Sequence, residues 1–479
     1  MRSLPPTTAA PLTLDDDRLL PTDPVLRGIA RDLYEQVRAL PLVSPHGHVD
    51  AGVFADDRPF PGPAELFVTP DHYVTRMLRS QGIALEALGV PRSDGGQVET
   101  DGRAIWRLLC ANWHLYRGTP SRLWLEQELY DLFDVRLRPS AETADDIYDA
   151  LAARLASAEF RPRALYQRFG LEVLATTDSP LSTLEDHRRL RDDPTWEGRV
   201  VPTFRPDSLV EILAAGWADR VAQLGELTTA DPTSYRGFVA ALEERRVAFQ
   251  EVGATATDHG HLTADSAPLS AEDAARIFER ALAGTADEAD AAAFRASMLS
   301  EFARMSCDDG LVMQVHPGVH RNYDTRIHDT FGPDVGFDIP TATQYAGPLH
   351  PLLDRYGTHP NLTVVLFTVD ETSFSREIAP LAGVYPSVRI GAPWWFLDAP
   401  QAMRRFREAT VETAGLYNTA GFVDDTRAFC SIPARHDVAR RIDCGFLASL
   451  VAQKLLPEDE AAQTAVDLTY TLPKQVFKI

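Results

Sequence analysis

Two histidines separated by one residue lie near the N-terminus, in the segment Pro45-His46-Gly47-His48-Val49-Asp50, directly after the short apolar run 39–43. Side chains alternate along a strand with a period of two, so both imidazoles of a His-x-His at a strand end point to one side. Neutral imidazole is a common ligand of divalent cations. The pair therefore predicts either a metal site at the mouth of a barrel or two loop histidines without a metal.

Residues able to bind metals, anions or sugars also follow most of the other short apolar runs. In chain order they are Asp178, Arg205, Asp258, His316, Arg321, Asp370, Trp394, Trp395, Asp425 and Arg427. In a barrel of parallel strands, catalytic side chains come from the carboxyl ends of several strands. The concentration of such residues at strand ends indicates one site assembled from most of the chain.

Many of these residues also have an ordinary structural explanation. Three aspartates could cap helices: Asp178, Asp207 and Asp370. Three histidines could lie in loops or at the surface: His259, His261 and His320. Arg205 and Arg321 could form internal ion pairs, and Trp394 and Trp395 could pack in the core. The set of His46, His48 and Asp425 differs from these. Two imidazoles and a carboxylate supply three ligands and leave positions open, as a catalytic zinc ion requires. We therefore favour the metal-site interpretation for these three residues.

The elements that would position these residues alternate between strand and helix. Residues 23–40 predict an amphipathic helix, and residues 54–170 have helical periodicity without a clear strand. Eight strand-like runs occur at residues 39–43, 172–176, 199–204, 251–256, 311–315, 362–367, 388–391 and 421–423. This alternation predicts an α/β fold, a (β/α)8 TIM barrel with a helical insertion after strand 1. We expect a flexible N-terminal arm over 1–21, a catalytic barrel over 22–53 and 171–479, and the helical insertion over 54–170.

Composition restricts the partners. The formal net charge is -22 across 479 residues, which disfavours nucleic acid and anionic membranes. An anionic substrate would then require a local cluster of Arg. The four cysteines show no metal or disulfide spacing, the first residues do not resemble a signal peptide, and no apolar run approaches membrane-spanning length. We expect a cytoplasmic enzyme.

Several motifs resemble those of the uronate isomerase (glucuronate isomerase) family, an atypical branch of the metal-dependent amidohydrolase superfamily. The matching stretches are SPHGHVD, DHYVTRMLRSQGI, TTDSPLSTLEDH, VPTFRPD, TDHG, MQVHPGVHRNYD, GFDIP, GAPWWFLDAP and GFVDDTRAFCSIPARHDVARR. They extend from Ser44 to Arg441, nearly the whole chain. The resemblance implies a barrel of the metallo-dependent hydrolase type.

The resemblance further implies that the chain interconverts D-glucuronate with D-fructuronate, and D-galacturonate with D-tagaturonate. Its motif positions suggest metal ligands at His46, His48 and Asp425; catalytic groups at Tyr73, Asp425, Arg427 and His316; and substrate-binding groups at Arg205, Arg321 and Asp258, to which we add Trp394. No candidate for a bridging Lys is evident, consistent with a single divalent ion. We expect Zn2+, with Mn2+ or Fe2+ as alternatives.

The chemistry agrees with this set of residues, because moving a proton between C1 and C2 through an enediol requires a base, an acid and a group that stabilises the oxyanion. Two alternatives stay open. A metal-dependent hydrolase of the same superfamily would share His-x-His and Asp425 but would not need the Arg pair or Tyr73. A non-catalytic relative would have lost part of the site.

We also expect a homo-oligomer because the insertion is apolar and Trp-rich, although burial of these residues against the barrel is the alternative.

Overall fold

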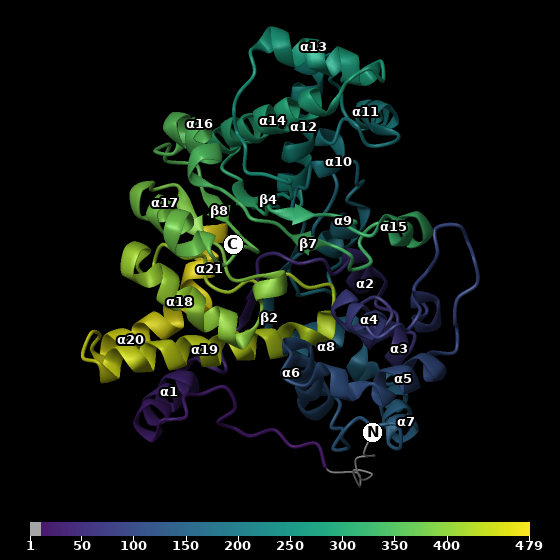
Figure 1. Ribbon diagram of the computed structural model, residues 1–479, viewed down its shortest axis with the longest axis vertical. Coiled ribbons are helices and arrows are strands. Elements are labelled where there is room, and N and C mark those ends of the chain that lie inside the picture. The colour runs from purple at the N-terminus through teal and green to yellow at the C-terminus, as the bar shows by residue number, and fades with distance from the viewer. Residues whose placement is uncertain (1–10) are drawn as a thin grey trace.

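Short apolar segments pair as parallel strands in the middle of the fold, and helices surround them (Figure 1). The computed structural model describes residues 11–479. One sheet has the order β1-β2-β3 and a second has the order β4-β5-β8-β9. The strands are β1 Leu42–Ser44, β2 Leu171–Ala175, β3 Val200–Val201, β4 Ala256–His259, β5 Val312–Val315, β8 Val364–Leu366 and β9 Val388–Ile390.

Isolated bridges connect the two sheets into one sequence of neighbours. Phe204 pairs with Asp178 on one side and with Thr257 on the other, so β3 leads into β4. Beyond β9, Ile390 pairs with Thr419, and the segment that follows returns to β1 through a hydrogen bond from the His48 N–H to the Thr426 carbonyl (2.9 Å). The spatial order therefore follows the chain order, which is the topology of a (β/α)8 barrel.

Two predicted strands differ from the structure. The run 251–256 is wrong as a strand, because helix α12 extends to Glu251 and β4 begins at Ala256, after Gly253 with φ +97°. The run 421–423 is not paired as a strand in the described chain. Gly421 has φ +74°, outside the β region, so the pairing that begins at Thr419 cannot continue as a regular ladder.

The chain between β1 and β2 is helical. Its helices gather at the lower right of Figure 1 and are α2 Ala51–Asp56, α3 Pro63–Phe67, α4 His72–Arg79, α5 Gly102–Ala111, α6 Pro120–Gln127, α7 Ala144–Leu155 and α8 Pro162–Arg168. The tryptophans of this region, Trp106, Trp113 and Trp124, are buried. The expected apolar surface on an exposed arm is therefore wrong, because these side chains fill the protein's own core.

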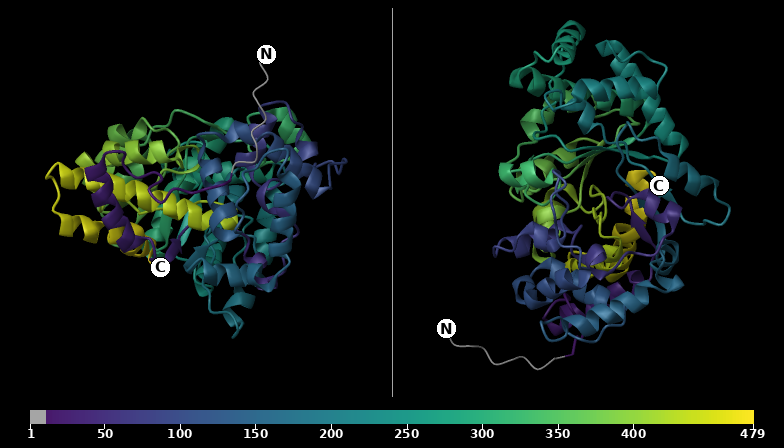
Figure 2. Two further views of the ribbon diagram at one scale, coloured as in Figure 1. Left: turned by 90° about the horizontal axis from the view of Figure 1, so that it is seen from below. Right: turned by 90° about the vertical axis from the view of Figure 1, so that its right-hand side faces the viewer.

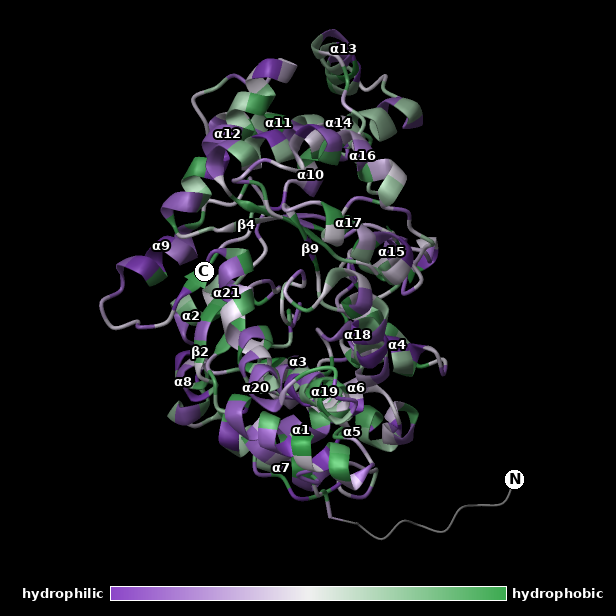
Figure 3. Cartoon of the chain, turned by 90° about the vertical axis from the view of Figure 1, so that its left-hand side faces the viewer, coloured by the Kyte–Doolittle hydropathy of each residue, from purple (hydrophilic) through white to green (hydrophobic). Residues whose placement is uncertain are grey.

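The remaining helices cover the other strands. They are α9 Glu185–Asp192, α10 Asp207–Val210, α11 Trp217–Glu226, α12 Tyr235–Glu251, α13 Ala271–Leu282, α14 Glu288–Asp309, α15 Thr325–Phe331, α16 Ala346–Tyr356, α17 Ala379–Val384, α18 Pro400–Ala414, α19 Ile432–Ala452, α20 Glu458–Val466 and α21 Leu472–Phe477. Polar residues lie mainly on the outer helices in Figure 3, whereas the central strands are largely apolar. This is the pattern expected when helices cover a parallel sheet.

Helix α1 (Pro24–Val37) begins as the sequence predicts, because Asp23 caps its first turn and proline occupies the first helical position. It packs along α19 at one side of the molecule (Figure 2). Residues 1–10 of the predicted arm lie outside the described residues. The rest of that arm is not free, because Leu12 is buried and its N–H donates to the Arg136 carbonyl.

A small hairpin lies beside the main strands. It consists of β6 (Val319–His320) and the antiparallel β7 (Ile339–Pro340), with α15 in the connection between them. The connection is joined to the helical region by the Ser93 N–H, which donates to the Thr330 carbonyl (2.9 Å). No apolar run reveals this hairpin in the sequence, because its strands have only two residues each.

Across residues 11–479, none of the helices combines the length and apolar character that crossing a bilayer would require. The four cysteines are buried and free, which agrees with the absence of disulfide spacing in the sequence.

A buried histidine at the end of β4 gives the fold a pH dependence. His259 has no exposed surface, and burial holds its pKa well below the usual value. Its contribution to stability is present above pH 6.5 and lost as the pH falls, because the unfolded chain takes up the proton first. Relative to His259→Gln, we expect the native protein to lose about 2 kcal/mol more unfolding free energy between pH 7 and pH 5.

Urea unfolding at both pH values measures this difference. The control is His328→Gln, because the His328 side chain lies at the surface and is 46% exposed. Parallel losses in the native protein and in His259→Gln would contradict a neutral, buried His259.

Candidate active site

All ten residues that the sequence assigned to the site line one cavity of about 410 Å³ at the carboxyl ends of the strands. They are His46, His48, Tyr73, Arg205, Asp258, His316, Arg321, Trp394, Asp425 and Arg427. They come from segments between residues 46 and 427, as expected for a site formed where several strands end.

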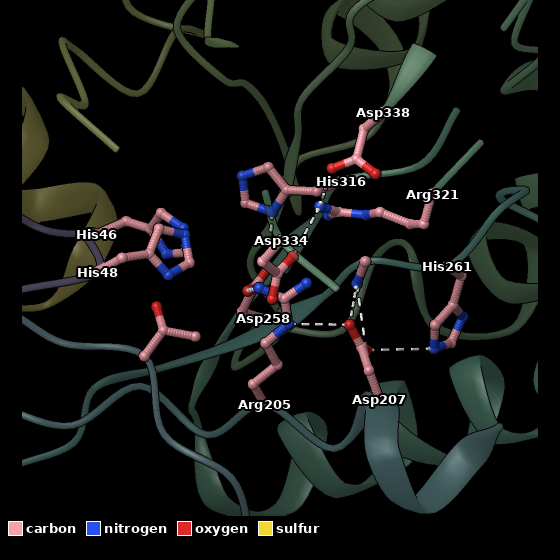
Figure 4. Close-up of polar contacts among 12 residues, drawn as sticks. His46, His48, Arg205, Asp207, Asp258, His261, His316, Arg321, Asp334 and Asp338 are labelled. Carbon is pink, nitrogen blue, oxygen red and sulfur yellow. Dashed lines mark hydrogen bonds and ion pairs between the residues drawn. The ribbon is translucent and has the colours of Figure 1, made fainter. Parts of the chain in front are cut away.

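The His-x-His pair meets Asp425 at the top of β1. The Oδ1 atom of Asp425 is 3.0 Å from Nε2 of His48 and 3.4 Å from Nε2 of His46. These three donor atoms lie within 4.8 Å of one another, close enough to hold one metal ion. Figure 4 shows the two imidazoles side by side, in the segment that follows the last residue of β1, Ser44.

The backbone and the charge of Asp425 are both unusual. Its φ is +40°, a value that few residues other than glycine adopt and that Asp and Asn tolerate better than most. Burial raises the pKa of its carboxyl group, but the charge of His46 and hydrogen bonds from both histidines hold that pKa well below its usual range. Asp425 is therefore a carboxylate at neutral pH. Burial also lowers the pKa of His48, which favours the neutral imidazole that a metal requires.

A second group of possible ligands shares His46. Asp258 and His316 join it, again with donor atoms within 4.8 Å of one another. The Oδ1 atom of Asp258 is 2.7 Å from Nδ1 of His316, and Nε2 of His316 is buried without a hydrogen-bond partner among residues 11–479. This leaves one ring nitrogen of His316 available to a substrate or a metal.

Two carboxylates orient Arg205. Its Nε donates to Asp207 Oδ2 (2.9 Å), and its Nη1 lies 3.3 Å from Asp258 Oδ2 (Figure 4). Burial raises the pKa of Asp258, but Arg205 and His316 hold it well below the usual range, so this residue is a carboxylate. The side chain of Arg205 is 27% exposed and lines the cavity, so it combines a fixed position with access to an anionic ligand.

Arg321 approaches the cavity from the β6–β7 hairpin. Its Nη1 lies 3.6 Å from Asp338 Oδ2 and 4.0 Å from Asp334 Oδ1. Its guanidinium stacks over the ring of Trp395 at 5.0 Å. Arg427 reaches the same hairpin through Nη1, which donates to the Asp334 carbonyl (3.5 Å). The hairpin therefore joins two cationic side chains at the mouth of the cavity.

Tyr73 comes from the helical region. The side chain of Asp71 accepts a hydrogen bond from the Tyr73 N–H (2.8 Å) and caps α4, which fixes the first turn of the helix at the cavity wall. Burial raises the pKa of the Tyr73 hydroxyl. The phenol is therefore protonated at neutral pH and can donate a hydrogen bond.

Several functional positions were missed or interpreted differently in the sequence. Asp207, a possible helix cap, pairs with Arg205, and His72, Asp334 and Asp338 also line the cavity. His72 lies in the stretch DHYVTRMLRSQGI and Asp338 in GFDIP, whereas Asp334 lies in none of the matching stretches. Nothing local distinguishes these three side chains from those of ordinary loop residues. Asp370 is a local cap, since its Oδ1 accepts from the Thr372 N–H.

His259 is the last residue of β4, so its loop interpretation is wrong, whereas His261 lies in the loop after β4, as the sequence suggested. His259 and His261 are 0% and 3% exposed. His261 lies behind Asp207, with Nε2 3.9 Å from its Oδ1 (Figure 4). His320, by contrast, is an exposed surface residue, as the sequence suggested. The two tryptophans expected either in the core or at the site, Trp394 and Trp395, are buried and also line the cavity.

Comparison with known proteins identifies the family. A family model described as glucuronate isomerase matches residues 18–477. The chain belongs to this family. The uronate isomerase of Rhizobium meliloti (strain 1021) is 53% identical over 466 residues, covering 97% of this chain and 99% of that protein. The uronate isomerase of Xanthomonas campestris pv. campestris (strain B100) is 52% identical over 469 residues, covering 98% and 99%. The resemblance drawn from the motifs is confirmed.

Solved structures support the same assignment. The structure of glucuronate isomerase from Caulobacter crescentus is 47% identical, with a TM-score of 0.96 over 98% of this chain and 97% of that one. Uronate isomerase from Thermotoga maritima is 30% identical, with a TM-score of 0.90 over 97% and 99%. The predicted α/β barrel fold class is confirmed.

The geometry at the end of β1 predicts the metal affinity of variants. Asp425→Asn keeps a residue that tolerates positive φ but removes the anionic ligand, and His48→Ala removes an imidazole. We expect each to weaken Zn2+ binding by more than about 100-fold, because loss of a direct ligand should exceed the effect of an outer contact. Titration calorimetry with Zn2+ measures the affinity directly. His320→Ala is the control, and equal affinity in all of these proteins would contradict the ligand set.

Proposed function

We propose that this protein is a uronate isomerase that interconverts D-glucuronate with D-fructuronate and D-galacturonate with D-tagaturonate. The observation that supports this most directly is the combination, in one cavity, of a His-His-Asp donor set with Arg205, Arg321 and Arg427. In a chain of net charge -22, such a group of cations suits an anionic ligand. Membership of the glucuronate isomerase family supports the same activity.

We propose that His46, His48 and Asp425 hold one divalent cation, with Zn2+ preferred over Mn2+ or Fe2+. The donor set fits, because two imidazoles and a carboxylate are typical zinc ligands and their donor atoms already lie together. Asp425 Oδ1 is buried and lies within 3.4 Å of both imidazole Nε2 atoms, so the three donor atoms surround one position that a cation can take. When bound, the ion would polarise a substrate oxygen and stabilise developing negative charge.

Arg205 and Arg321 recognise the carboxylate that distinguishes a hexuronate from a neutral hexose. A guanidinium forms two parallel hydrogen bonds to a carboxylate, which adds orientation to charge attraction. Their own ion pairs with Asp207, Asp258 and Asp338 hold both groups in position before the substrate arrives. Trp394 contributes an apolar wall beside His316, with ring centroids 4.5 Å apart.

Proton transfer falls to other residues of the same cavity. Asp425 accepts the C1 hydroxyl proton as the sugar ring opens, and Tyr73 gives its hydroxyl proton to the ring oxygen. The resulting Tyr73 phenolate, beside the guanidinium of Arg427, takes the proton from C2 and returns it to C1, and the proton on Asp425 then restores the phenol. His316 holds a substrate hydroxyl through its free Nε2, since Asp258 fixes the orientation of its ring. Buried donors that are already oriented stabilise the charge of an enediolate without reorganisation during the reaction. The hydrolase alternative is not favoured, because hydrolysis does not require this arrangement of Tyr73 and Arg.

We further propose a catalytic barrel over residues 22–53 and 171–479, with residues 54–170 as a helical insertion, in a cytoplasmic protein. The insertion is not independent of the barrel. Its core includes Trp106 and Phe133 together with Leu42 of β1 and Leu171 of β2. It therefore folds as part of the same hydrophobic core and can hold Tyr73 at a fixed distance from the strands.

Turnover before and after metal removal tests the activity. We expect purified protein to convert D-glucuronate and D-galacturonate to keto acids, to lose activity after chelation, and to regain it when Zn2+ is restored. Neutral hexoses should react poorly because they lack the carboxylate that Arg205 and Arg321 bind. Formation of hydrolysis products from a lactone or amide, with no keto acid from either hexuronate, would contradict the proposal.

The role of Tyr73 predicts a loss of rate rather than of binding. Tyr73→Phe keeps the buried ring but removes the hydroxyl, so we expect kcat to fall by about 100-fold or more, with KM changed little. Steady-state kinetics on D-glucuronate gives both parameters. Tyr166→Phe is the matched control, since Tyr166 is a buried tyrosine that does not line the cavity and whose hydroxyl donates to the Arg199 carbonyl. A Tyr73→Phe variant with more than half the native kcat would exclude Tyr73 as the proton carrier.

A further inference from the structure

A guanidinium group is buried directly behind the cavity, at Arg435 in the first turns of α19. Its side chain is 1% exposed and does not line the cavity itself. Nη1 donates to Asp398 Oδ2 (2.5 Å), and Nε donates to Ser431 Oγ (3.0 Å). The guanidinium stacks on the ring of Trp124 at 3.6 Å and lies 5.3 Å from the ring of Tyr73.

These contacts join three segments that contribute side chains to the site. Asp398 follows the segment of Trp394 and Trp395. Ser431 Oγ donates to the Ala428 carbonyl (2.7 Å) and lies 3.4 Å from Thr426 Oγ1, so it holds the turn that contains Asp425 and Arg427. Trp124 and Tyr73 belong to α6 and α4 of the helical region. Arg435 therefore links three parts of the site: the segment after Trp394 and Trp395, the turn that contains Asp425 and Arg427, and the helical insertion.

The guanidinium of Arg435 also balances the negative charge of buried acids. Asp398 is 2% exposed, and burial raises its pKa to about 7 even though Arg435 acts in the opposite direction. Asp71 and Glu128, two further acids with raised pKa values, also face Arg435. A buried ion pair contributes little net stability, because both ions must lose their hydration. Retaining such a pair beside an active site is better explained by the geometry that it imposes.

We propose that Arg435 is a positioning residue for the isomerisation: it fixes Tyr73 and the turn of Asp425 and Arg427 relative to one another without touching the substrate. The inference rests on the proposed function, because it concerns the same reaction. A shift of about 1 Å between groups that exchange a proton can lower a rate by about 100-fold. Substrate binding should be retained, because Arg205 and Arg321 are anchored by other carboxylates.

The first test replaces Arg435 by Lys, which keeps the positive charge but cannot donate to Asp398 and Ser431 while stacking on Trp124. Arg246→Lys is a matched control. Arg246 is also 1% exposed, and it donates to Asp309 (2.6 Å) and to Ser306 Oγ (2.9 Å), but it does not line the cavity. For each protein, kcat and KM on D-glucuronate are measured per folded, zinc-loaded chain, together with the thermal unfolding temperature.

We expect Arg435→Lys to lower kcat by about 10- to 100-fold with KM within about threefold of the native value. Arg246→Lys should lower the unfolding temperature but leave kcat within about twofold, because it shares only the structural role. An unchanged kcat in Arg435→Lys, or an equal fall in Arg246→Lys, would overturn the inference. Native protein that turns over neither hexuronate would instead reject the proposed function and, with it, this inference.

Smaller changes decide the question if Arg435→Lys fails to fold. Ser431→Ala removes the hydroxyl that links Arg435 to the turn of Asp425, and Asp398→Asn weakens the ion pair without changing the side-chain shape. Each should lower kcat several-fold, with KM and zinc content preserved, since both residues act only through position. Native kcat in both variants would overturn the proposal.

Discussion

The carboxylate of Asp425 between two imidazoles is the interaction on which the rest of this site depends. His46 and His48 come from the end of β1, whereas Asp425 comes from the last segment of the barrel, more than 370 residues later. Their contact, with the backbone hydrogen bond from His48 to Thr426, joins the first and last segments at the mouth. The side chains that would hold a cation therefore also join β1 to the segment around Thr426, where no regular strand pairing does so in the described chain.

Charge balance around this centre explains how an acidic protein can bind an acid. Arg205 and Arg321 are each held by carboxylates, so neither has to be ordered when a substrate arrives. Preorganisation of this kind reduces the entropy lost on binding. It also restricts where an anion can bind, because the surrounding Asp residues repel it everywhere else. Strong negative net charge and an anionic substrate are compatible because the field in the cavity is set by local side chains.

The helical insertion and the β6–β7 hairpin extend the site beyond what the strands supply. The insertion contributes Tyr73, and the hairpin contributes Arg321, Asp334 and Asp338. Both are anchored by packing or hydrogen bonds to other parts of the fold, including the contact of Ser93 with Thr330. The residues that we propose to exchange protons or bind a carboxylate thus project from anchored segments. This matters because a misplacement of about 1 Å can lower a rate by about 100-fold.

The sequence by itself determined the family, the alternation of strands and helices, and ten of the residues that line the cavity, because motif spacing and hydrophobic period are local properties. It could not determine the edges of β4, whose polar Thr257 and Asp258 interrupt the apolar pattern, or the loss of pairing after Thr419, where Gly421 adopts a positive φ. Partners such as Asp207 with Arg205, or Asp398 with Arg435, emerged only in the tertiary structure. A carboxylate has the same local sequence signature whether it caps a helix, pairs with an arginine or binds a metal. Only the three-dimensional neighbourhood decides among these roles.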